Sequence, residues 1–293
     1  MALIAMIPLA ALPVTLGPIQ IALTELLVLL ATVSVAVERW RQPQLPRQPL
    51  LQQREHWPVI LFLVAALASL LVTEYPRQSL RELRVLIVEP VALYVLLRSV
   101  PLDSLWLQRA VRALIGLTTA VTLVGLGMAM TGHGLVDAEG VQRVVGLYPS
   151  PNHFALILGR VIPFSLALAL AAGPGRALYG LATGTMIVGL LATFSGGGWL
   201  GAAASGLVVV WFMLGGRWAL GVLALSGIAG ALALGVIRVE RIASRIDPSR
   251  GTGFIRLRLW EASLAMVRDH PVLGIGLDNF LYRYQQQYLP PEA

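Results

Sequence analysis

The sequence predicts an all-α protein, namely a polytopic transmembrane helix bundle with an external amphipathic-helical segment at its C-terminal end. Of 293 residues, 57% are hydrophobic and only 13% are charged, about half the charged fraction of a soluble domain. Apolar stretches of about 20 residues recur along the chain, which is the length that crosses about 30 Å of hydrocarbon. After Ile237 the chain becomes polar, amphipathic and rich in arginine.

The residues from 1 to 14 are apolar, but they lack a basic region and are interrupted by Pro8 and Pro13. This pattern argues against a cleavable signal peptide. We expect a short or half-crossing helix, or the end of a helix that starts upstream.

Eight further apolar windows are the expected membrane spans. They are residues 19–37, 57–73, 84–98, 112–130, 153–172, 177–194, 199–214 and 219–237. Short loops rich in arginine favour the cytoplasmic side, which places 38–56, 98–112 and the turns at Arg176 and Arg217 there. The external side then receives 74–83, 131–152, 195–198 and the chain after 237.

The expected domains are a helix bundle over residues 1–237 and an external segment over residues 238–293. Within that segment, residues 254–268 have helical spacing of their apolar positions, and Pro271, Gly274 and Gly276 then end the helix. The segment stops without a closing apolar helix, so we expect it to be truncated.

The charge balance points to anionic partners. All 22 basic residues are arginine, and the net charge is +7, which suits lipid headgroups or phosphate-bearing substrates. Nucleic acid is a poor partner, because the arginines are spread over several loops. The absence of cysteine excludes disulfide and thiol chemistry, and four scattered histidines predict no metal site.

Three stretches of the sequence are typical of one family when they occur together. They are RVVGLYPSPNHFALILGRVIPF (143–164), TFSGGGWLGAAASG (193–206) and RLRLWEASLAMVRDHPVLGIGLDNFLYRY (256–284). Together they resemble the O-antigen ligase and O-antigen polymerase family of polytopic membrane glycosyltransferases. Two departures stand out: Gly196 occupies a position where the family usually has arginine, and the chain ends before the family's His-Asn motif.

The resemblance implies an enzyme of lipopolysaccharide or polysaccharide biosynthesis in the cell envelope. Its activity would be transfer of a glycan from undecaprenyl diphosphate to an acceptor on the periplasmic side of the inner membrane. The acceptor is lipid A-core in ligases and another lipid-linked repeat unit in polymerases. The implied partners are this donor, a lipid or glycan acceptor and membrane lipids, without a metal or a cofactor.

Arg160 lies inside an apolar window, seven residues after His153. A charge at bilayer depth costs at least about 3 kcal/mol and marks a functional position by default. Arg160 lies roughly 10 Å below the external end of its helix, where a water-filled cleft would let it contact a substrate phosphate. The alternative is a structural ion pair with Glu25 or Glu89.

Other arginines are candidates for the same task, because the planar guanidinium suits phosphate oxygens and stabilises charge on a leaving diphosphate. Arg143 is expected either to bind the second phosphate or to be a solvated loop residue. Arg77, Arg81 and Arg84 share one helical face, where they form a phosphate row or snorkel to the interface.

Three polar residues complete the expected donor site. Asn152 is the expected N-cap of the helix that follows. His153, in the first turn of that helix, either donates to a phosphate or sugar hydroxyl or is an interfacial residue. Ser195 precedes three glycines, which form either a backbone anion site at a helix N-terminus or a plain turn.

The candidates for acid–base catalysis are Asp269 and His270. A general base must lie within hydrogen-bond distance of the acceptor hydroxyl. The alternative for His270, which precedes Pro271, is that it shapes the turn.

Two other classes of function stay open. A transporter or flippase of lipid-linked sugars usually shows repeats with matched midplane charges, and the sequence shows neither. If the chain is truncated, a non-catalytic membrane protein is favoured.

Overall fold

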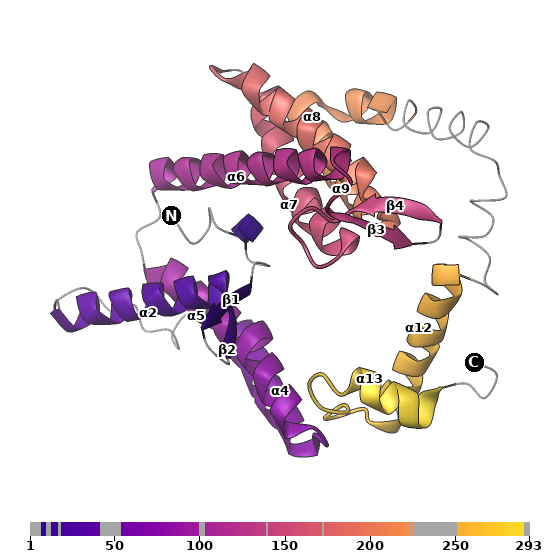
Figure 1. The fold of residues 1–293 in the computed structure, drawn as a ribbon. Helices are drawn as coiled ribbons and strands as arrows, with labels where there is room; N and C mark the ends of the chain where they lie inside the picture. Colours follow the sequence, from indigo (N-terminus) through magenta and orange to yellow (C-terminus); the bar gives the residue numbers. More distant parts are fainter. Residues whose placement is uncertain are drawn as a thin grey trace. The chain divides into compact units, whose positions relative to one another are not determined.

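The computed structural model describes residues 7–9, 13–16, 19–41, 54–99, 103–138, 140–171, 173–222, 224 and 251–289. In these residues, regular structure is helical apart from two antiparallel β-hairpins (Figure 1), which confirms the predicted all-α membrane bundle. The chain divides into two compact units. The first contains Met1–Leu27 and Leu102–Ile237, and the second contains Val28–Pro101 and Arg238–Ala293.

Four helices form the body of the first unit. They are α6 (Ser104–Met130), α7 (Pro151–Leu170), α8 (Arg176–Ala192) and α9 (Gly196–Leu214). Among the described residues, α6, α7 and α9 are long and apolar enough to cross a membrane, and α8 is a shorter apolar helix. The helix α6 begins earlier than the predicted span at residue 112, because Asp103 caps it by accepting a hydrogen bond from the Trp106 amide at 2.6 Å.

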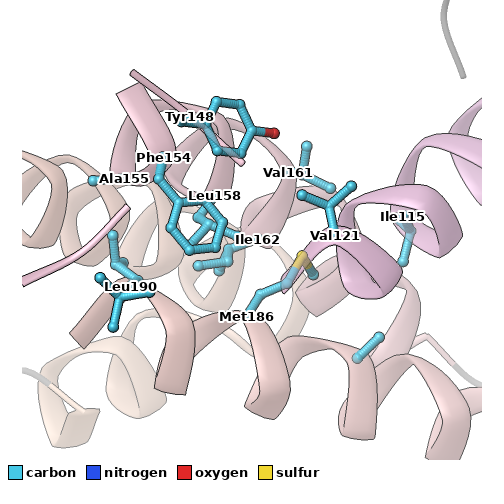
Figure 2. Packing of buried hydrophobic residues seen from close by; sticks show 12 residues of the cluster. Ile115, Val121, Tyr148, Phe154, Ala155, Leu158, Val161, Ile162, Met186 and Leu190 are labelled. Carbon is cyan, nitrogen blue, oxygen red and sulfur yellow. The ribbon is translucent and has the colours of Figure 1, made fainter. Parts of the chain in front are cut away.

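The core of the first unit forms around α7, which packs against both α8 and α9. Phe154, Leu158 and Met186 are fully buried in it (Figure 2). The ring of Tyr148 stacks on Phe154 with centroids 5.2 Å apart, and its hydroxyl donates to the carbonyl of Pro8. Burial raises the pKa of Tyr148 to about 12, so the phenol stays protonated and keeps this bond.

The helices of the second unit divide into an early group and a late group. The early group is most of α2 (Leu23–Arg41), η3 (Arg54–His56), α3 (Trp57–Ser69), η4 (Leu70–Val72), α4 (Pro76–Glu82), η5 (Leu83–Val88) and α5 (Glu89–Ser99). The late group is α12 (Gly251–Asp269), α13 (Phe280–Arg283) and η6 (Tyr284–Tyr288). The predicted helix at 254–268 is therefore present as α12.

The helix from Pro76 to Ser99 changes its winding part-way. The segment η5 is a π-helical turn, and it ends directly before Glu89 and Pro90. Because Pro90 has no N–H to donate to the preceding turn, a locally wider helix accommodates the lost hydrogen bond.

The prediction for the N-terminal region was wrong in two places. The residues expected as a short helix contain η1 (Ile7–Leu9) and the strand β1 (Pro13–Leu16). β1 pairs with β2 (Ile19–Ala22), so the predicted span at 19–37 begins as a strand, and α2 begins only at Leu23. β-Branched residues in both strands, namely Val14, Thr15, Ile19 and Ile21, favour extended backbone.

The predicted span at 219–237 lies mostly outside the described residues. The orientation in the membrane and the division between a bundle at 1–237 and an external segment at 238–293 remain predictions.

Candidate active site

A polar cluster forms where α7 and α9 begin. The hairpin of β3 (Leu135–Ala138) and β4 (Val141–Val144) carries Arg143 to it. The Arg143 Nε donates to the carbonyl oxygen of Thr193 at 2.8 Å, and Nη2 donates to Asn152 Oδ1 at 3.1 Å. Ser195 Oγ donates to the same Asn152 oxygen at 2.9 Å. The amide of Asn152 therefore joins the β-hairpin, α7 and the turn before α9.

The turn between α8 and α9 is fixed by its own hydrogen bonds. Thr193 Oγ1 donates to the carbonyl of Leu190 at 2.6 Å and accepts from the Ser195 amide at 3.2 Å. Phe194 has a φ of 49°, a left-handed conformation that bulky residues rarely adopt. The Arg143 guanidinium lies at the C-terminal end of α8, where a cation is favoured by the helix dipole.

The predicted N-cap of α7 was wrong by two positions. Ser150, not Asn152, caps the helix by accepting from the His153 amide, and Pro151 occupies the first turn. Serine before proline is itself a signature of a helix start, so this assignment could have been made from the sequence. The bridging role of Asn152 has no such local signal, because its partner Ser195 lies 43 residues further along the chain.

Arg160 and His153 lie on one exposed face of α7. They are seven residues apart, nearly two turns at about 3.6 residues per turn, so they point in similar directions. Among the described residues of the first unit, Arg160 makes no hydrogen bond or ion pair. The alternative of an ion pair with Glu89, which lies in the second unit, stays a prediction. His153 Nδ1 lies 2.7 Å from the Ser150 hydroxyl.

The N-terminus of α9 is open. Ser195 is the N-cap residue, yet its hydroxyl is used by Asn152 and does not cap the helix. A Cβ built at Gly196 or Gly197 would meet nothing within 4 Å. Backbone N–H groups at such a helix end favour an anion, so they add to the positive potential of Arg143.

The remaining predicted site residues lie in the second unit. Arg77 and Arg81 are exposed on α4, whereas Arg84 lies in the π-helical turn and pairs with Glu89, with Nε and Oε1 3.8 Å apart. The structure thus keeps α-helical spacing for two of the three arginines.

Asp269 and His270 stand at the C-terminal end of α12. The Tyr288 hydroxyl donates to Asp269 Oδ2 at 2.7 Å, and this bond raises the pKa of the Tyr288 phenol. The Gly274 amide donates to the His270 carbonyl at 3.2 Å, so the histidine backbone takes part in the turn that follows the helix.

Comparison with known proteins supports the family that the sequence resembles. Residues 181–293 match the sequence model of a family described as O-antigen ligase. The resemblance to the O-antigen ligase family is confirmed. No curated protein and no solved structure matches the chain.

The O-antigen ligase match covers most of α8, all of α9 and the late helices of the second unit. It includes Ser195, Asp269 and His270, whereas Arg143 and Arg160 precede it. With the long apolar helices, the match supports a membrane glycosyltransferase of the O-antigen ligase or polymerase type that acts in polysaccharide biosynthesis.

Proposed function

We propose that this chain transfers a glycan from undecaprenyl diphosphate to an acceptor on the outer side of the inner membrane. The acceptor is lipid A-core or another lipid-linked glycan, and no metal is needed. The observation that carries the proposal is Arg160 with His153 on the exposed face of α7, the helix whose start is bonded to Arg143.

The donor's diphosphate supplies a partner for Arg160, which has none among the described residues. Arg160 would bind one phosphate from within the apolar part of α7. His153, in the first turn of α7, would donate to a phosphate or sugar hydroxyl. Arg143 adds positive charge beside the open N-terminus of α9. Charge-assisted hydrogen bonds of this kind are among the strongest that proteins make.

The reaction is a displacement at the anomeric carbon of the donor sugar. The acceptor hydroxyl oxygen forms the new glycosidic bond, while the bond from carbon to the diphosphate oxygen breaks and its electron pair leaves with undecaprenyl diphosphate. Cations stabilise the charge that builds on this leaving group. The acceptor hydroxyl loses its proton in the process, and we assign that proton to the pair Asp269 and His270.

Replacing Asn152 by Asp tests whether an anion binds at the cluster. An aspartate keeps the acceptor oxygen that Arg143 and Ser195 use, so the fold should be retained. Its negative charge would repel a diphosphate, and we expect transfer to fall at least about 10-fold. The assay is transfer of a lipid-linked glycan to lipid A-core by membranes that contain the full chain.

The control is Gln142→Glu, the same change of amide to acid at the exposed neighbour on β4. Transfer should be nearly unchanged in that variant. Equal activity of Asn152→Asp and the unsubstituted chain would argue against a diphosphate at this cluster.

The external position of the C-terminal segment is tested by reporter fusions. Alkaline phosphatase fused after Arg250 should be active, because this enzyme folds only outside the cytoplasm, and a fusion after Arg176 should be inactive. Reversed activities of the two fusions would overturn the proposed orientation, which follows from the arginine bias of the loops.

A further inference from the structure

A short segment of the second unit inserts between helices that precede it by about 200 residues. This docked segment is residues 275–279, just before α13 (Figure 1). The Leu277 side chain packs against the buried cluster that Ala66 of α3 forms with Leu83 and Ile87. The contact therefore joins the late group of helices to the early group through an apolar anchor.

A buried polar contact accompanies that anchor. Asn279 and Ser79 are both 0% exposed. Asn279 Nδ2 donates to Thr73 Oγ1 at 2.8 Å and to the Ile275 carbonyl at 2.9 Å. Ser79 Oγ donates to the Leu277 carbonyl at 2.5 Å and lies 2.6 Å from Thr73 Oγ1.

The backbone of the docked segment comes unusually close to its partner. A Cβ built at Gly276 would lie 2.9 Å from Thr73 Cα, and the residue has a φ of +91°. Only glycine is tolerated at such a position without strain. The approach is therefore specific to one arrangement of the segment and not a loose apolar contact.

A second set of contacts surrounds the buried one. Arg283 Nη2 lies 2.8 Å from Glu74 Oε1, and the Arg283 side chain is only 13% exposed. Tyr75 and Tyr282 stack with ring centroids 4.2 Å apart. Gln286 Nε2 donates to the Tyr75 hydroxyl at 2.8 Å.

These contacts connect two groups of candidate site residues within the unit. Ser79 lies on α4 between the exposed Arg77 and Arg81. At the other end, Tyr288 of η6 donates to Asp269. The docked segment and residues 282–288 therefore connect α4, which carries these arginines, to Asp269, a candidate for the base.

A buried amide with hydrogen-bond partners favours one arrangement of the segments that it joins. Any arrangement that leaves the amide unpaired costs the free energy of desolvating it. We propose that Asn279 is a positioning residue, which holds Asp269 and His270 in a fixed place relative to Arg77 and Arg81 by bonding the docked segment to Thr73. This inference rests on the proposed function. In the proposed reaction, Asn279 itself contacts neither the glycan donor nor the acceptor.

The test uses the full chain in membranes and two measurements. The chain has no cysteine, so Ser79→Cys places one thiol beneath the docked segment. A membrane-impermeant maleimide should label it slowly. Adding Asn279→Ala should raise the labelling rate at least about 10-fold, because opening exposes the thiol.

Transfer is measured separately in Asn279→Ala without the cysteine. We expect the transfer rate at saturating donor to fall at least about 10-fold, because misplaced catalytic groups lower the rate of the chemical step. The apparent KM for the lipid-linked donor should change less than about 3-fold. The control is Gln285→Ala, which truncates an exposed amide that has no partner among the described residues. It should alter neither measurement.

Exchanging the two charges of the ion pair between Arg283 and Glu74 distinguishes loss of this contact from failure to fold. Arg283→Glu should impair transfer by repelling Glu74, and the double variant Glu74→Arg with Arg283→Glu should recover part of it. Absence of that recovery would argue against the docking contact as the cause.

The outcomes separate the two claims. Faster labelling with unchanged transfer would overturn the positioning role and leave the proposed function standing. Unchanged labelling would overturn the docking contact. Absence of transfer by the unsubstituted chain would overturn the proposed function, and the positioning role with it, even if labelling behaves as expected.

Discussion

Arg160→Ala is expected to abolish glycan transfer, with a fall in the transfer rate of at least about 100-fold. A loss of this size is typical when an enzyme loses one preorganised group that stabilises developing charge. The reason is that Arg160 is exposed on an apolar helix and has no partner among the described residues. A charge in that position is costly unless something neutralises it. The variant should still insert, since removal of a membrane charge does not disfavour the helix. Transfer and membrane content are measured together.

Two further variants test whether the guanidinium of Arg160 is the cause of the expected loss of transfer. Arg160→Lys keeps the charge but loses the planar fork, and we expect an intermediate loss of about 10-fold. Arg176→Ala removes an exposed arginine at the start of the neighbouring helix α8, on the predicted cytoplasmic side, and should leave transfer unchanged. Full activity of Arg160→Ala would remove Arg160 from the donor site.

Gly198→Ala is expected to destabilise the first unit and to lower transfer with it. A Cβ at Gly198 would lie 2.7 Å from Ala155 Cβ, where α9 crosses α7. The helices must then separate, at a cost of about 1–3 kcal/mol. The same separation would stretch the bond between Ser195 and Asn152. Unfolding of the purified protein in detergent measures the first effect.

A compensating change makes this prediction specific. Ala155→Gly removes the atom that the new methyl group meets, so the double variant should regain stability relative to Gly198→Ala. Gly201→Ala, on the same helix with nothing within 4 Å, should be neutral or stabilising because alanine favours helix. A double variant no more stable than Gly198→Ala would contradict the close packing of α7 and α9.

The fold class could be predicted from the sequence because apolar length and helical period are local signals. The windows that became α7, α8 and α9 were placed to within a few residues. The stretch that became β1 and β2 was missed, since an apolar stretch rich in β-branched residues is compatible with both a membrane span and a strand. The start of α6 was missed because Asp103 was not recognised as a cap.

The site was only partly within reach of the sequence. Arg143, Arg160 and Ser195 could be named because arginine and glycine runs are conspicuous in an apolar chain. Asn152 as a bridge and Asn279 as a buried anchor could not, since their partners Ser195 and Thr73 lie far along the chain. Only tertiary packing brings such pairs together.

The most direct measurement is a transfer reaction with the purified full chain in liposomes, given undecaprenyl-diphosphate-linked O-antigen glycan and lipid A-core. We expect glycosylated acceptor and free undecaprenyl diphosphate in equal amounts, without added metal, and neither product from the Arg160→Ala variant. Release of undecaprenyl diphosphate without glycosylated acceptor, or no consumption of the donor at all, would contradict the proposed function.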